Sequence, residues 1–75
     1  MYANLKLEMG LKEISIETIA KTLEIHRNSV SNKINGESSF SIEEAFKIQA
    51  VHFPYADMQY LFKRTSKREE QKHRG

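Results

Sequence analysis

The chain has 75 residues, of which 39% are hydrophobic and 29% are charged, so we expect one small globular domain and no second one. It has no cysteine, which excludes a disulfide scaffold and a thiolate zinc site. Residues 1–13 lack the apolar run of a signal peptide, and no stretch approaches the ~20 apolar residues of a membrane span, so we expect a cytoplasmic protein.

The net charge of +2 is unevenly distributed along the chain. Residues 1–62 contain six Lys/Arg and eight Asp/Glu, a net charge of −2, whereas residues 63–75 contain six Lys/Arg and two Glu, a net charge of +4. We therefore predict a domain over residues 1–63 and a basic, disordered tail over residues 64–75. The tail is either a solvated terminus or an arm that adds non-specific attraction to phosphates.

The first helix is predicted over about residues 2–12. Tyr2, Leu5 and Met9 form an apolar stripe at helical spacing, and Leu7 and Leu11 form a second stripe on the opposite side. Two such stripes indicate a helix that is buried between several neighbours, and a dimer contact is the alternative.

A second, shorter helix is predicted to begin after Ser15, whose hydroxyl can accept a hydrogen bond from an unpaired backbone N–H of the first turn. Its apolar residues lie on one helical face; they are Ile16, Ile19, Ala20 and Leu23. The third helix is predicted over residues 26–34 with Val30 and Ile34 inward, and Gly36 ends it because glycine adopts the left-handed conformation without a Cβ penalty.

Ser41 and Glu44 have the spacing of a capping box, which predicts the start of a fourth helix that extends to about residue 51 or 52, before Pro54. We expect it to bury some of its apolar residues, which are Ile42, Ala45, Phe46, Ile48 and Val51. Asp57 can cap a short fifth helix over about residues 58–63, with Met58, Leu61 and Phe62 inward. The sequence thus predicts an all-α fold of five short helices.

The second and third helices carry the strongest functional signal. Only two or three residues separate them, and Ala20 is small enough to allow a close crossing. This is the arrangement of a helix-turn-helix, in which the second helix lies in the major groove of DNA and the first spans the backbone.

The outward face of the third helix is polar and carries no acid. Arg27, Asn28, Ser31, Asn32 and Asn35 share an arc of roughly 140°. Arginine can bind guanine bidentately and asparagine can bind adenine in the same way. Amides and hydroxyls are poor helix formers, so their concentration here suggests that they are used. We predict base contacts from this face and phosphate contacts from Lys21, Lys33 and His26.

The segment 15–36, SIETIAKTLEIHRNSVSNKING, resembles the Xre/Cro-type helix-turn-helix of phage repressors and related bacterial regulators. The resemblance covers about residues 4–62 and is closest to short, single-domain members from prophages and mobile elements. It implies a compact five-helix, lambda-repressor-like domain that binds a palindromic operator as a homodimer. It implies base contacts from Arg27, Asn28, Ser31 and Asn32, and phosphate contacts near Ser15, Lys33, Asn35 and Ser38.

Two positions depart from the family pattern. Glu24 stands in the turn where the family usually has glycine, so the turn either differs or holds a strained residue. Lys33 stands at a position that is often apolar, next to Ile34, which leaves the register of the last turn of the third helix open by one residue.

The sequence predicts a sequence-specific transcriptional regulator of the repressor type, with half-sites about 34 Å apart. The alternative is a protein-interaction module on the same fold that does not bind DNA, such as an antitoxin, an anti-repressor or an accessory subunit. The acidic balance of residues 1–62 favours this alternative.

We expect no enzyme, no cofactor, no metal, no membrane and no small-molecule substrate. His26, His52 and His73 lack metal-ligand spacing. His26 and Ser29 are three residues apart, as a base and a nucleophile can be on a helix, but no third orienting residue accompanies them. Tyr55 and Tyr60 are expected to be half-buried or part of a dimer surface rather than platforms for base stacking.

Overall fold

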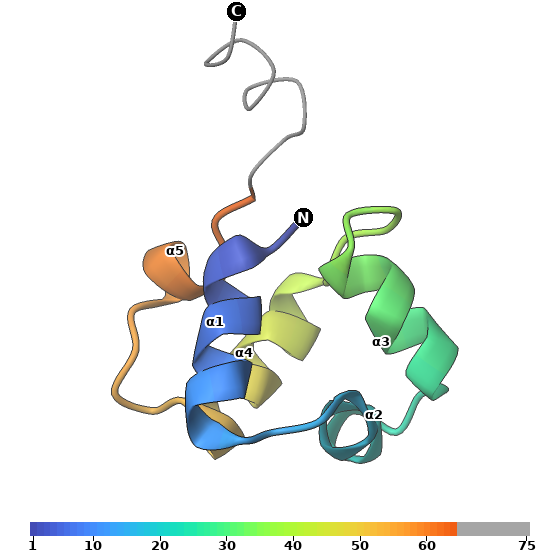
Figure 1. The fold of residues 1–75 in the computed structure, drawn as a ribbon, viewed down its shortest axis with the longest axis horizontal. Helices are drawn as coiled ribbons and strands as arrows, with labels where there is room; N and C mark the ends of the chain where they lie inside the picture. Colours follow the sequence, from blue (N-terminus) through green and yellow to red (C-terminus); the bar gives the residue numbers. More distant parts are fainter. Residues whose placement is uncertain (65–75) are drawn as a thin grey trace, which may run out of the picture.

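The computed structural model describes residues 1–64. This part of the chain is all-helical, without a strand, and forms a compact bundle (Figure 1). Its five helices are α1 (Ala3–Lys12), α2 (Ile16–Leu23), α3 (Arg27–Ile34), α4 (Ile42–His52) and α5 (Met58–Leu61). The predicted five-helix, all-α fold is confirmed. The predicted tail lies outside the described residues except for Arg64, and no helix within residues 1–64 is long and apolar enough to cross a membrane.

Three helices begin at the polar residue that the sequence predicts. The hydroxyl of Ser15 and the carboxylate of Asp57 each accept the backbone N–H three residues along the chain, at 3.2 and 3.1 Å. Ser41 and Glu44 form the reciprocal capping box at the start of α4. Each cap pairs a backbone donor that the first turn of a helix leaves without an internal partner.

The bounds of α1, α3 and α5 differ slightly from the predicted ones. α3 begins at Arg27 because His26 is extended and caps the helix, its ring Nδ1 accepting the N–H of Asn28 at 3.1 Å. α1 begins at residue 3 because the backbone N–H of Tyr2 donates to Ile34 O at 3.0 Å, outside the helix. α5 is two residues shorter than predicted and has only one turn.

The end of α3 settles the register that the sequence left open. Ile34 is buried and Lys33 only partly so, which places Ile34 and not Lys33 in the core. Gly36 follows in the left-handed region with φ of +95°, as predicted. The helix therefore stops where glycine can reverse the chain without a Cβ clash.

The core lies where α2 packs against α3 and α4, while α1 packs against α3 and α5. Its largest fully buried side chains come from all five helices and the segment after α4; they are Leu5, Ile19, Val30, Ile48, Phe53 and Leu61. Three aromatic rings, those of Tyr2, Phe40 and Phe62, meet with centroids 5.2–5.9 Å apart. This cluster brings the start of α1, the loop after α3 and the end of α5 together.

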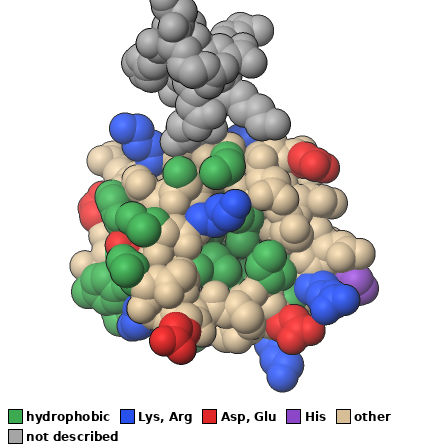
Figure 2. All heavy atoms as spheres, in the orientation of Figure 1, with side chains coloured by type: hydrophobic (Ala, Val, Ile, Leu, Met, Phe, Trp, Pro, Cys, Tyr) green, Lys and Arg blue, Asp and Glu red, His purple; other side chains and the backbone are tan. Residues whose placement is uncertain are grey.

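The expectation that α1 is buried between several neighbours is wrong, because its second apolar stripe faces solvent. Five large apolar side chains of α1 and α4 are between 54% and 75% exposed; they are Leu7, Leu11, Ile42, Phe46 and Val51. A bundle this small has only a limited core, so the second stripe of a helix can stay uncovered. Figure 2 shows hydrophobic side chains gathered over the side of the molecule that carries α1 and α5.

On that side of the molecule a surface cluster joins α1 to α5. The Glu8 carboxylate accepts the hydroxyls of Tyr55 at 2.8 Å and Tyr60 at 3.0 Å, and Lys12 Nζ lies 5.0 Å from the Tyr55 ring centroid. The hydrogen bonds to Glu8 raise the pKa of both tyrosines, because they hold the phenol in its protonated form. The rings are 60% and 39% exposed, so of the two only Tyr60 approaches the predicted half-burial.

A side-chain hydrogen bond also links α4 to α2. His52 Nε2 lies 2.7 Å from the hydroxyl of Thr22. The same hydroxyl lies 3.0 Å from Thr18 O, so it links the histidine to the backbone of α2. Burial of the ring, with a smaller effect from the charge of Lys12, lowers the pKa of His52. As predicted, His52 is the last residue of α4.

Candidate nucleic-acid interface

Three residues, Glu24 to His26, connect α2 to α3. Glu24 has φ of 59° and ψ of 42°, so the turn contains a left-handed residue that is not glycine. Of the two alternatives for this turn, the strained residue is the correct one. Because Glu24 reverses the chain, α3 begins close to α2, and Ala20 lies buried in the core that these helices share.

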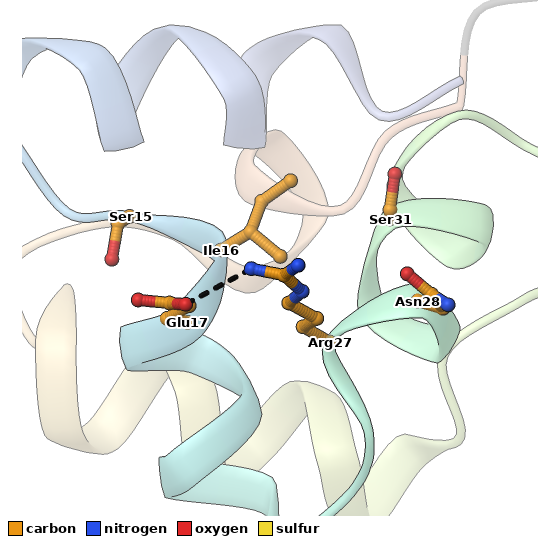
Figure 3. A pocket seen from close by; sticks show the side chains of 6 residues that line it. All are labelled: Ser15, Ile16, Glu17, Arg27, Asn28 and Ser31. Carbon is orange, nitrogen blue, oxygen red and sulfur yellow. Dashed lines mark hydrogen bonds and ion pairs between the residues drawn. The ribbon is translucent and has the colours of Figure 1, made fainter.

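The N-terminal parts of α2 and α3 border an open groove of about 500 Å³ (Figure 3). Its lining residues are Ser15, Ile16, Glu17, Arg27, Asn28 and Ser31. Three of the four residues predicted to contact bases therefore lie together with Ser15, which was predicted to contact phosphate. The packing of α2 against α3 brings these two segments together.

Arg27 extends across this groove to the start of α2. Its Nη1 lies 3.1 Å from Glu17 Oε2, and both side chains are about two-thirds exposed (Figure 3). An ion pair this exposed contributes only ~0–1 kcal/mol, because water screens it. The pair therefore orients the guanidinium over the groove without holding it strongly, and a ligand with a competing acceptor can replace Glu17.

The amides and the hydroxyl on the outer face of α3 have no partners within residues 1–64. Asn28 and Asn32 are exposed and Ser31 is partly exposed. None of their side chains makes a hydrogen bond to another of the residues 1–64. An amide offers two donors and two acceptor lone pairs, so this face presents several hydrogen-bonding groups that are available to a ligand.

No protein-family model, curated protein or solved structure matches this chain. A function therefore has to be inferred from the chemistry of the groove and the surfaces around it. Over the described residues, no group of three or more His, Cys, Asp and Glu is arranged to hold a metal ion.

Two of the residues predicted to contact phosphate have internal roles. Ser15 caps α2 and also lies 3.0 Å from the Thr18 hydroxyl. Lys33 Nζ donates to Ser39 O at 3.1 Å and lies 3.5 Å from Glu44 Oε1, so it fastens the loop after α3 to the start of α4. Contacts with phosphate from either residue require a change in these bonds.

The other residues predicted to contact phosphate are exposed. The side chains of Lys21, Asn35 and Ser38 form no hydrogen bond or ion pair within residues 1–64. His26 is exposed as well, and only its Nδ1 is used, in the cap of α3. These four residues keep polar groups free on the outside of α2, α3 and the loop that follows.

Sequence analysis missed two residues that shape this surface. Glu17 was not among the predicted contact residues, and Arg64 was predicted only as the first residue of the tail. The signal for Glu17 was its place two residues after Ser15, at a helix end that was already expected near phosphate. Nothing in the local sequence indicated that Arg64 binds the loop after α3, because 25 residues separate it from Ser39.

Proposed function

We propose that this chain is a sequence-specific DNA-binding transcriptional regulator in which α2 and α3 act as a helix-turn-helix. The observation that supports this most is the outer face of α3, where exposed asparagines that have no partner in the described part of the chain lie beside an arginine held over an open groove. These are side chains that discriminate bases at the edges of adenine and guanine. We assign base contacts to Arg27, Asn28, Ser31 and Asn32.

The dimensions of α3 suit the major groove of DNA. An α-helix with its side chains is about 10–12 Å in diameter, which fits the width of about 12 Å of that groove. α3 contains two cations, Arg27 and Lys33, and no acid, so it does not repel the phosphates on either side. Lys21 on α2 adds a further cation, which is exposed and suits the backbone contact that the first helix makes in this motif.

One such helix contacts only a few base pairs, which is too little to define a site in a genome. We therefore propose a homodimer that binds a palindromic operator, acts as a repressor of the prophage or mobile-element type, and works in the cytoplasm. Ser15, His26, Asn35 and Ser38 would fix the register on the phosphates, which carry no sequence information.

Selection of bound duplexes from a random library tests binding, base preference and palindromy in one experiment. We expect a symmetric consensus, and steep loss of affinity for random duplex as salt rises, since phosphate contacts release counterions. Replacing Arg27 by alanine should lower affinity for the selected site by ~1–3 kcal/mol and relax one base position. An equal loss on random duplex would mean that Arg27 contacts only phosphate, and no duplex binding at low salt would refute the proposal.

A second candidate function is a protein-interaction module on the same fold. The exposed Leu7 and Leu11 of α1 and Phe46 of α4 favour it, because large apolar side chains on a surface are typical of a partner site. The salt titration separates the two candidates. A module of this kind stays inert towards duplex DNA at every salt concentration, whereas a DNA-binding protein binds at low salt.

A further inference from the structure

The loop between α3 and α4 carries Asn35 and Ser38, both of which the proposed function places near phosphates. The chain holds this loop from inside through the carbonyl of Asn32, which accepts the N–H groups of Glu37 at 2.9 Å and Ser38 at 3.4 Å. These bonds fix the first half of the loop relative to α3. Lys33 Nζ holds the carbonyl of Ser39 at 3.1 Å, and the side chain of Arg64 supplies further contacts to the segment from Gly36 to Ser39.

Arg64 binds this segment at both of its ends. Its Nη2 donates to Gly36 O at 3.0 Å and its Nη1 donates to Ser39 Oγ at 2.6 Å. The guanidinium carbon lies 5.4 Å from the centroid of the Tyr2 ring, within the range of a cation–π contact. One planar side chain thus bridges the two residues that flank Glu37 and Ser38, from a position 25 residues further along the chain.

The Tyr2 ring, against which the Arg64 guanidinium lies, is itself firmly held. Tyr2 is buried, its N–H donates to Ile34 O at 3.0 Å, and its hydroxyl accepts the N–H of Phe40 at 3.2 Å. A Cβ added to Gly36 would lie 2.7 Å from the backbone nitrogen of Met1, so the loop also packs tightly against the first residue. Tyr2 therefore contacts both sides of the loop and gives the guanidinium a rigid ring to stack on.

We propose that Arg64 is a positioning residue for DNA binding: it holds residues 36–39 in the conformation in which the loop meets the phosphate backbone. This inference rests on the proposed function. Arginine suits the role because its planar fork donates in two directions at once while its face stacks on an aromatic ring. Lysine at this position would keep the charge but lose both the second fixed donor and the stacking.

The test compares Arg64→Ala, Arg64→Lys and Lys63→Ala in the full chain. Lys63 is the matched control, because it is the neighbouring exposed cation and its side chain binds no other residue in 1–64. We expect both Arg64 variants to bind the selected duplex about tenfold more weakly, the equivalent of one lost hydrogen bond to a charged group. Lys63→Ala should weaken binding by less than about threefold, which is half of the tenfold effect on a logarithmic scale.

The salt dependence separates positioning from direct contact. If Arg64 only holds the loop, the slope of log affinity against log salt stays that of the wild type in Arg64→Lys and Arg64→Ala. If Arg64 itself neutralises a phosphate, the slope of Arg64→Ala falls by about 0.9, and the positioning role is overturned. Wild-type affinity in both Arg64 variants, or an equal loss in Lys63→Ala, overturns it as well.

A readout without DNA keeps the inference separate from the proposed function. Amide hydrogen exchange of residues 36–39 should be faster in Arg64→Ala than in the wild type, and Ser39→Ala, which removes one acceptor, should show a smaller increase. Unchanged exchange means that Arg64 does not hold the loop. If the wild type fails to bind any duplex, the proposed function is wrong and the DNA role of Arg64 is refuted with it, whatever the exchange shows about the loop.

Discussion

Two surfaces of this small bundle carry polar side chains but differ in how these polar groups are used. On the outer face of α3, the exposed side chains of Asn28 and Asn32 bind nothing else in residues 1–64. On the side of α1 and α5, Asn4 Nδ2 donates to Tyr60 O at 2.8 Å, and Glu8 accepts two tyrosine hydroxyls. On the α1–α5 side the polar groups bind one another and stabilise the fold, whereas on the outer face of α3 they are available to a ligand.

This difference shows why exposure alone does not identify a binding face. Polar side chains that pair with one another across helices stabilise the tertiary structure, and their removal lowers stability. Polar side chains that stand unpaired on a rigid helix, in residue types that disfavour a helix, contribute nothing to folding. Mutations on the two surfaces should therefore have opposite effects on stability and on DNA binding.

The largest expected effect comes from replacing Asn28 and Asn32 together by alanine. Affinity for the selected duplex should fall by ~3 kcal/mol, since each asparagine can supply a bidentate contact to adenine. The free energy of unfolding should rise by ~0.5 kcal/mol for each replacement, because alanine is the better helix former. Titration with labelled duplex and urea denaturation measure the two quantities.

Asn4→Ala is the matched control on the other surface. It removes the hydrogen bond to Tyr60 O and should lower the free energy of unfolding by ~1 kcal/mol, with DNA affinity unchanged. The contrast between the two faces breaks down if the double variant on α3 is destabilised, or if Asn4→Ala weakens duplex binding by as much.

The next effect concerns the two left-handed glutamates that end α1 and α2, Glu13 with φ of 57° and Glu24 with φ of 59°. Replacing Glu24 by glycine should stabilise the protein by ~1 kcal/mol, because the relief of backbone strain exceeds the entropy that glycine adds to the unfolded chain. Glu13→Gly should behave alike. Glu24→Ala removes the same charge but keeps the backbone strain, so it separates the effect of charge from that of strain. If urea denaturation shows that alanine stabilises the protein as much as glycine does, relief of backbone strain is excluded as the cause.

Glu17→Gln should have a smaller effect, and it should raise the affinity for DNA. It removes a negative charge from the groove and frees the Arg27 guanidinium, which lies 3.1 Å from Glu17. Affinity for random duplex at low salt should rise about threefold, in line with the strength of an exposed ion pair. In an Arg27→Ala background the gain should be smaller, because no guanidinium is left to release; an equal gain there would show that only the net charge matters.

The smallest expected effect is a dependence of stability on high pH that arises from the α1–α5 surface. The hydrogen bonds to Glu8 raise the pKa values of Tyr55 and Tyr60 above the ordinary 10.0 in the folded state. The unfolded chain therefore loses these protons first, so this stabilisation is complete below pH 10 and declines as the pH rises through the folded pKa values. Glu8→Gln should lower both tyrosine midpoints in an absorbance titration and weaken this decline, while DNA binding near pH 7 stays the same.

Much of the fold could be predicted because it depends on neighbours in the sequence. Ser15, Ser41 and Asp57 cap the helices that were expected to follow them, since a cap needs only a backbone N–H three residues away. Gly36 ends α3 for a similarly local reason. The inward residues of α2 and α3 also followed from the 3.6-residue period.

The sequence also supplied most of the residues that line the groove, but not how they pair. Arg27, Asn28 and Ser31 were expected on one face of α3, and helical periodicity alone puts them there. That Arg27 lies against Glu17 depends on the angle between α2 and α3, which the left-handed conformation of Glu24 sets. The separation of ten residues between Glu17 and Arg27 in the sequence does not reveal this angle.

The sequence by itself therefore determined the caps that start α2, α4 and α5, the glycine that ends α3, and which polar residues share the outer face of α3. The tertiary structure alone decided that Leu7, Leu11 and Phe46 stay uncovered, that Glu8 binds two tyrosines, and that Arg64 holds the loop after α3. The reason is physical. Caps and periodicity arise from bonds within one or two helical turns, whereas exposure and long-range pairing depend on how five helices divide a limited core among themselves.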